Sequence, residues 1–311
     1  MFGKHLNQIR LSLSITPNGP LAIRSGRTGA DPTRPDLECV RTTFEGQPSV
    51  YLPGSSIKGV LRSHAERLLR SENVNITDTF SMEGRKAFKQ DSEGPEVYSG
   101  TCPIGRTFGN LHVKGRLSVS DHMPGGSDPT GSDERREQVR LANEVTQRNG
   151  VGIDRLTGSA STGALFDIEA VVQGRFDGQI TLRNAQLYQL ALALFVLRDL
   201  DEGWVRLGSS SSRGFGEVKV EIRELVIESR RGKTPGGQLY GYGSLIDDAA
   251  GYDLFPDDKV MLPADLKPSN QLMWQRLVVP KERVFDVAES LVDGPWMAFL
   301  NAAKAKKGWA A

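Results

Sequence analysis

The chain has 311 residues, a formal net charge of +1, two cysteines and a hydrophobic content of 38%, so it is long enough for one large or two ordinary domains with a sizeable core. The near-zero charge excludes binding of nucleic acid through bulk charge alone, and two cysteines exclude a disulfide framework. No apolar run approaches the roughly 20 residues that span a bilayer, and the N-terminus lacks the apolar block of a signal peptide. We therefore expect a cytoplasmic protein without membrane contacts.

The first elements are a strand, a hairpin and a helix. Apolar side chains at every second position of residues 9–15 are typical of a half-buried strand. A loop rich in Gly, Arg and Pro follows at 24–36, and residues 39–52 resemble a hairpin that turns at Glu45-Gly46. From the PGSS turn to Arg70, apolar residues share one face at helical spacing, which predicts an amphipathic helix.

A long insertion, residues 71–148, separates this helix from the next regular pattern, and a dense run of turn-forming residues within it predicts a mobile loop at 124–133. The later elements are predicted as strands at 164–172, 175–182, 204–207 and 217–227 and a helix at 185–199.

This order predicts an α+β fold. Strand, helix, strand, strand, helix, strand is the βαββαβ order of a ferredoxin-like or RRM-like core, with a large insertion after the first helix. We assign this core to residues 1–229 and a C-terminal extension to residues 230–311, which ends in a helix near 295–307.

The start of the first helix, LPGSSIKGVLR, suits an anion. Ser55 is the expected N-cap and Gly54 permits close backbone approach, so free N–H groups and the positive end of the helix dipole favour phosphate. Ser56, Lys58 and Arg62 add a hydroxyl and two cations at the same place. The alternative is an ordinary capped helix with solvated cations.

A second candidate is the loop LGSSSSRGFGEV. Its backbone amides could surround a phosphate while an arginine or a ring stacks on a base. It is not a Walker A loop, because no Gly-Lys-Ser/Thr ends it. The alternative is a flexible connection between strands. The candidate residues are Ser211, Ser212, Arg213, Gly214 and Phe215.

A third candidate is RNGVGIDRLTGSASTGALFDIE, where glycines punctuate a projecting hairpin with Arg148 and Arg155 on its stems. Such a hairpin could touch a nucleic-acid strand. The alternative is a structural turn at Asp154-Arg155.

Together these stretches resemble the RAMP superfamily, and most closely the backbone subunits of type III RNA-guided CRISPR effector complexes. The similar pieces are LPGSSIKGVLRSHAERLL, GRLSVSD, NGVGIDRLTGSASTGALFDIEAV and SSSSRGFGEV, within roughly residues 5–227. The resemblance implies that Lys58, Arg62 and the Gly/Ser loop hold a guide RNA (crRNA). It also implies a thumb at about 149–165, and as partners the target RNA, other subunits and further copies or paralogues of this chain.

The resemblance also implies a cleavage site. Catalytic members cut target RNA with a divalent metal, Mg²⁺ or Mn²⁺, and an aspartate between the first strand and the PGSS helix. Asp36 precedes LECVRTTF, as in the family arrangement, whereas Asp31 precedes Pro32 and resembles a turn residue. We predict that Asp36 is the functional aspartate; Asp31, or neither, are the alternatives.

Other chemistry has weaker support. Gly105 stands where some relatives carry the second cysteine of a zinc site after Cys102, so we expect no structural zinc. His64 lies on the apolar side of the first helix and is expected in the core. Two alternative functions remain: a scaffold of the same complex without cleavage, and a stand-alone guide-processing endoribonuclease. The latter would need an acid–base set that the scattered histidines do not suggest.

Overall fold

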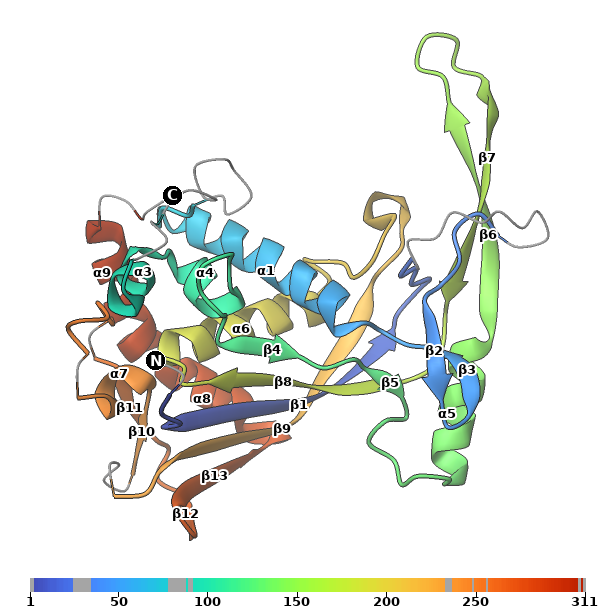
Figure 1. Ribbon diagram of the computed structural model, residues 1–311. Helices are drawn as coiled ribbons and strands as arrows, with labels where there is room; N and C mark the ends of the chain where they lie inside the picture. Colours follow the sequence, from blue (N-terminus) through green and yellow to red (C-terminus); the bar gives the residue numbers. More distant parts are fainter. Residues whose placement is uncertain are drawn as a thin grey trace.

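A computed structural model describes residues 3–24, 35–77, 88, 92–232, 237–247, 249–255, 257–306 and 309. Its centre is an antiparallel sheet in the order β12-β13-β9-β1-β8-β4, in which β5 also pairs with β8 (Figure 1). The strands of this sheet are β1 (Asn7–Pro17), β4 (Leu117–Val119), β5 (Met123–Pro124), β8 (Phe176–Arg183), β9 (Val218–Arg230), β12 (Ser269–Gln271) and β13 (Trp274–Pro280).

The order β9-β1-β8-β4 is that of a ferredoxin-like core. Helix α1 (Gly54–Ser71) connects β1 to β4, and helix α6 (Leu187–Asp201) connects β8 to β9. The predicted α+β fold is therefore confirmed. The alternation predicted for the first strand is confirmed as well, because Ile9, Leu11, Leu13 and Ile15 are each at most 1% exposed.

Two strand predictions were wrong. The second core strand is the short β4 within GRLSVSD, which pairs with β8, and not the segment 164–172. That segment belongs to β7 (Ala160–Val171), whose partner is β6 (Val145–Ile153). Residues 204–207 form a bend and irregular chain, not a strand.

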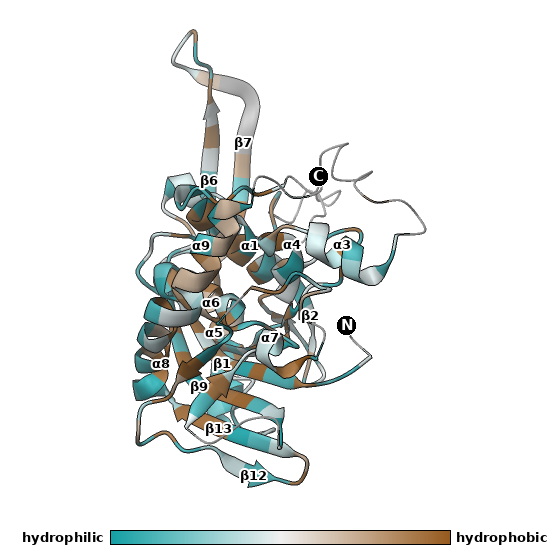
Figure 2. Ribbon diagram, turned by 90° about the vertical axis from the view of Figure 1, so that its left-hand side faces the viewer, coloured by the Kyte–Doolittle hydropathy of each residue, from teal (hydrophilic) through white to brown (hydrophobic). Residues whose placement is uncertain are grey.

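β6 and β7 form a hairpin that projects far from the body of the molecule (Figures 1 and 2), and we call it the thumb. It is longer than the predicted 149–165. At its base lie α5 (Asp133–Asn143) and the hairpin of β2 (Arg41–Phe44) and β3 (Gln47–Val50). The predicted turn of that hairpin at Glu45-Gly46 is confirmed, and both residues have positive φ.

α1 and α6 lie together on one face of the sheet (Figure 1), and His64 joins them through a 2.7 Å contact from Nε2 to Asp199 Oδ2. His64 is therefore a core residue, as predicted. The short helices of the insertion and of the Gly/Ser loop are α3 (Gly94–Gly100), α4 (Pro103–Phe108) and the 3₁₀ turn η1 (Ser211–Arg213).

The chain beyond residue 230 continues the same sheet, because β13 pairs antiparallel with β9. The ring of Phe299 stacks on that of Tyr188 of α6 at 4.2 Å between centroids. The elements of this extension outside the sheet are β10 (Gln238–Tyr240), α7 (Tyr242–Leu245), β11 (Lys259–Met261), the 3₁₀ turn η2 (Lys281–Arg283), α8 (Val284–Leu291), the π-helical turn η3 (Val292–Trp296) and α9 (Met297–Ala305).

Among the helices that the structure describes, none is both long and apolar enough to cross a membrane.

Candidate nucleic-acid interface

The Gly/Ser loop, the base of the thumb and the segment after Asp36 are joined in one place. Leu37 pairs with β7, since its N–H donates to Asp167 O at 3.1 Å and its carbonyl accepts from Glu169 N at 3.0 Å. The Gly/Ser loop reaches the same region, because Ser209 N donates to Ala22 O at 2.9 Å. Ala22 in turn belongs to the segment that follows β1. Three stretches far apart in the sequence thus form one surface.

Phe215 lies inside this junction. It is 5% exposed and packs in a small cluster of its own, so the expectation of a ring free to stack on a base is wrong. The reason is that the loop must hold the base of the thumb, and an apolar ring fills that space. The other members of the cluster are Ala22, Ile168 and Ala170, with Leu37 and Phe166 packed against it.

The predicted loop residues other than Phe215 are exposed. Ser211, Ser212, Arg213 and Gly214 lie on the outside of the 3₁₀ turn. The guanidinium of Arg213 lies 5.4 Å from the ring of Phe166. These positions leave the hydroxyls and the cation available to a phosphate.

The loop keeps its shape through Gly216, which has a φ of +87°, a region that favours glycine. A Cβ there would stand 2.2 Å from Leu207 O. The glycine is thus required by both conformation and space.

The two thumb arginines lie at different heights. Arg148 is in β6 near the base, opposite Ile168, and its guanidinium lies 5.8 Å from the ring of Phe215. Arg155 is in the loop at the tip, between β6 and β7. Both are exposed. A strand running across the base would meet Arg148 and Arg213, whereas Arg155 faces whatever lies beyond the tip.

The start of α1 differs from the prediction. The N-cap is Pro53, and the N–H of Gly54 donates to the carboxylate of Asp121 at 2.8 Å. Ser55 is an exposed second residue of the helix, so its predicted role as the N-cap was wrong. A Cβ on Gly54 would stand 2.4 Å from Val119 O, because α1 begins directly against the GRLSVSD strand. The close approach puts Asp121 where a serine cap was expected.

Two cations remain on this part of α1, and Ser56 beside them is half-buried. Arg62 donates to Glu66 at 3.0 Å and to Gly109 O at 2.9 Å, so the fold already uses it. Lys58 has no hydrogen bond or ion pair to any part of the chain that the structure describes. Burial and the neighbouring charge of Arg62 lower the pKa of Lys58. A phosphate beside Lys58 would relieve this repulsion.

Asp36 is exposed, and its Oδ2 accepts a hydrogen bond from Asp167 N at 3.1 Å. The carboxylate is thereby fixed at the base of the thumb. Asp31, its predicted alternative, lies outside the described residues.

The chain after Asp36 is anchored by Glu169 of β7, which is 7% exposed. Its carboxylate accepts from Cys39 N at 2.7 Å and from both terminal nitrogens of Arg41 at 2.9 and 2.5 Å. Burial, and then the charge of Glu169, raise the pKa of the Cys39 thiol to about 12, so it stays protonated. Sequence reasoning missed Arg41 and Glu169 as positioning residues.

The donor set around Asp36 is smaller than the ligand set of a preformed metal site. Within the described ranges, no group of three or more His, Cys, Asp or Glu side chains could hold a metal ion. Mg²⁺, however, is commonly bound by one or two carboxylates together with substrate phosphates and water. A single exposed carboxylate therefore fits an ion that arrives with RNA better than a preformed protein cage.

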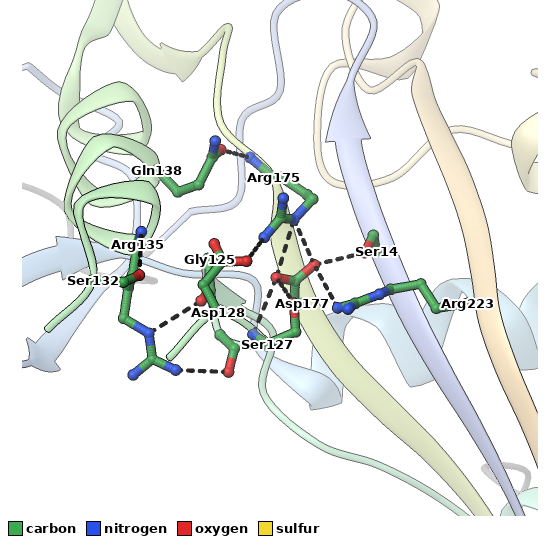
Figure 3. A network of polar contacts seen from close by, with 11 residues as sticks. Ser14, Gly125, Ser127, Asp128, Ser132, Arg135, Gln138, Arg175, Asp177 and Arg223 are labelled. Carbon is green, nitrogen blue, oxygen red and sulfur yellow. Dashed lines mark hydrogen bonds and ion pairs between the residues drawn. The ribbon is translucent and has the colours of Figure 1, made fainter. Parts of the chain in front are cut away.

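A second polar cluster fixes the root of the thumb (Figure 3). Asp177 accepts from Ser14 Oγ and Ser127 Oγ, both at 2.6 Å, and from Arg175 Nε at 3.1 Å. Arg175 also contacts Asp128. The segment predicted as a mobile loop, 124–133, is therefore held against β8 by these bonds.

Burial alone would raise the pKa of Asp177, but hydrogen bonds from Ser127 and Ser14 and the charge of Arg175 outweigh it and lower the pKa. The cluster extends to α5, because Arg175 N donates to Gln138 at 2.7 Å. α5 leads directly into β6, so the Asp177 cluster sets the direction in which the thumb leaves the body.

The same core is shared by a family of known proteins. The family model described as RAMP superfamily matches residues 14–219, well over half of the chain, from within β1 to the first residues of β9. The chain belongs to the RAMP superfamily. The resemblance predicted from the four motifs is thus confirmed, and the RAMP match covers α1, the thumb and the Gly/Ser loop but not the C-terminal extension.

This RAMP chain is also similar to a protein named CRISPR system Cms endoribonuclease Csm3 from Methanothermobacter thermautotrophicus. The two are 28% identical over 222 residues, which cover 63% of this chain and 79% of that protein.

Proposed function

We propose that this RAMP protein is a backbone subunit of a type III CRISPR effector complex, which holds a guide crRNA and cleaves the target RNA paired with it. Family membership and the similarity to a protein named as a CRISPR endoribonuclease support the class. The observation that carries the proposal is the exposed carboxylate of Asp36, held by Asp167 at the base of a projecting thumb. Further copies or paralogues and other subunits would line the same guide.

The guide is bound through its backbone. Lys58 on α1 and Ser211, Ser212 and Arg213 on the adjacent loop supply a cation without a described partner, two hydroxyls and a fork-shaped donor. Arg148 continues this line onto the thumb. None of these groups is arranged to distinguish bases, so sequence selection is left to pairing between guide and target.

Cleavage uses the 2′-OH of the target RNA. Its oxygen loses its proton to water and attacks the adjacent phosphorus, and the bond to the 5′-oxygen breaks. The leaving 5′-oxygen takes a proton from water, so the products are a 2′,3′-cyclic phosphate and a 5′-hydroxyl. This requires the 2′-OH to lie in line with the leaving oxygen. The thumb, braced at its base by the Arg41–Glu169 pair, is suited to distort the target at this linkage. Asp36 is held through Oδ2, which leaves Oδ1 for contacts at the reacting linkage.

A divalent ion bound with the RNA, Mg²⁺ or Mn²⁺, would neutralise charge that develops on the phosphate. Asp36 is the residue of this chain that would hold it. The carboxylate acts mainly on the transition state, so its loss should affect cutting far more than binding.

The test is Asp36→Ala in the assembled complex. Cutting of complementary target RNA should be abolished, while guide binding, target binding and assembly remain nearly intact. Chelation of divalent metal should have the same effect on the unaltered protein, and deoxyribose at the scissile position should block cutting. Asp31→Ala is the matched control and should cut almost normally. If Asp36→Ala cuts at the original rate, or if the unaltered complex binds target and never cuts it, the subunit is a scaffold.

A further inference from the structure

A groove of about 440 Å³ lies between the outward side of α1 and the Gly/Ser loop. It includes residues that the motifs did not single out. Its polar and aromatic lining residues are Ser63, Arg67, Trp204, Arg206, Ser211 and Ser212.

Trp204 is unusual among the four tryptophans of the chain. Trp204 is 73% exposed, whereas Trp296 and Trp309 are each 8% exposed. The backbone beneath it is ordered, because Trp204 N donates to Asp199 O at 2.9 Å directly after the turn at Gly203, which has a φ of +78°. The fold therefore presents a large flat ring to solvent from a fixed position, on a groove that the ring helps to line.

The groove is also lined by two arginines with few intramolecular contacts. Arg67 makes no side-chain hydrogen bond or ion pair within the described part of the chain. Arg206 has only long contacts, 3.4 Å to Ser211 O and 3.8 Å to Glu217. A flat ring beside two available guanidinium groups and three hydroxyls matches the chemistry of a nucleotide, which has an aromatic base and an anionic phosphate.

We propose that this groove binds one nucleotide of single-stranded RNA, with its base stacked on Trp204 and its phosphate held by Arg67 and Arg206. The proposal rests on the proposed function, because the guide must first lie along the Gly/Ser loop. Ser211 and Ser212 belong to the Gly/Ser loop and also line the groove. The bound nucleotide would therefore be part of the guide. The site thus adds a base contact to a guide-binding surface that otherwise holds the backbone.

A protein partner is the other class of occupant for an exposed tryptophan. The lining favours RNA, since three serines lie around the ring and serine is depleted at protein interfaces, whereas hydroxyls and guanidinium groups both bind phosphate.

The experiment measures tryptophan fluorescence while the full chain is titrated with single-stranded guide RNA at fixed salt. Binding should quench the emission, and Trp204→Phe should lose most of this quenching while binding nearly as tightly. Trp204→Ala should bind about 5- to 150-fold more weakly, the range expected for removal of one stacked base. Phe285→Ala, which removes another exposed aromatic side chain on α8, is the matched control and should bind normally.

Each other outcome counts against the site. Unchanged affinity of Trp204→Ala, or full quenching in Trp204→Phe, overturns it while leaving the proposed function intact. A third outcome is that the single Trp204→Ala chain binds RNA with unchanged affinity but forms shorter assemblies. The ring would then contact a neighbouring copy of the chain and not a base. If the unaltered chain binds no guide RNA, both the site and the proposed function fail. Because Trp204 is mostly exposed, the alanine variant should melt like the unaltered protein.

Discussion

At the scale of single residues, the start of α1 depends on one carboxylate that comes from far along the chain. Asp121 lies 67 residues after Gly54 and accepts its N–H, which places a negative charge at the positive end of the helix dipole. Ser55, the residue with the expected capping chemistry, faces solvent. The GRLSVSD motif thereby positions the helix that carries Lys58.

Asp121→Ala should lower the free energy of unfolding by about 1 kcal/mol, because an N–H at the helix start loses its acceptor. Ser55→Ala should change it by less than about 0.5 kcal/mol, since an exposed serine inside a helix is replaced by the best helix former. Urea denaturation of both variants measures the difference. A larger effect of Ser55→Ala than of Asp121→Ala would contradict this assignment.

Lys58 and Arg62 are expected to contribute unequally to guide binding. Lys58→Ala should weaken binding whatever the guide sequence and reduce the salt slope by about 1, because one phosphate contact is lost. Arg62→Ala removes the contacts to Glu66 and Gly109, so it should mainly lower the melting temperature. Binding isotherms at several salt concentrations separate the two effects. If a folded Lys58→Ala variant has an unchanged salt slope, Lys58 does not contact a phosphate and α1 is an ordinary helix with solvated cations.

At the scale of elements, the sequence predicted correctly the strands and helices whose residue pattern reflects burial of one face. The alternation in β1 and the helical spacing in α1 and α6 report burial of one face, and these elements are found where expected. The partner of a strand is a different matter. Residues 164–172 are apolar enough to suggest a core strand, yet they complete a hairpin with β6, while the three residues of β4 are too few to give a clear period.

In the candidate site as well, features that depend on local composition were predicted and features that depend on distant residues were not. The exposed serines of the Gly/Ser loop follow from their composition, whereas the burial of Phe215 depends on β7, which the sequence does not place beside it. The Arg41–Glu169 pair joins residues 128 positions apart, and no spacing rule could suggest it. The residues that could bind phosphate can therefore be predicted from the sequence, but the residues that hold them in position cannot.

The Asp177 cluster makes a prediction about the thumb and pH. Asp177→Asn should lower the free energy of unfolding at pH 7 by about 2 kcal/mol, because the carboxylate is buried and hydrogen-bonded while Arg175 is partly exposed. The folded-state pKa of Asp177 is lowered, so its contribution is present above the unfolded value of about 3.9 and is lost as the pH falls through the folded value.

Denaturation curves from pH 7 to pH 3 should therefore show the difference between Asp177→Asn and the unaltered protein shrinking in acid. Asp133→Asn on α5 is a suitable control, since its side chain is 94% exposed, and it should change stability by less than about 0.5 kcal/mol. A constant difference across this range would mean that the charge of Asp177 does not stabilise the loop.

At the scale of the whole molecule, the C-terminal extension is built into the RAMP core. β13 covers the edge of β9, and the carboxylate of Asp258 accepts the N–H of Leu187 at 2.7 Å, at the start of α6. Phe299 of α9 stacks on Tyr188 in the same helix. The extension lies outside the family match, yet it completes both the sheet and the helical layer.

The extension is predicted to stabilise the fold and to leave guide binding to the core. Truncation after Arg230 should give insoluble or poorly assembled protein, because it exposes the edge of β9 and the apolar side of α6. Phe299→Ala is the milder test: the side chain is fully buried, so its loss should cost about 3–5 kcal/mol. The variant's guide affinity, corrected for the folded fraction measured by circular dichroism, should equal that of the unaltered protein, since Lys58 and the Gly/Ser loop are untouched. Weaker binding by fully folded Phe299→Ala would instead place the extension in contact with RNA.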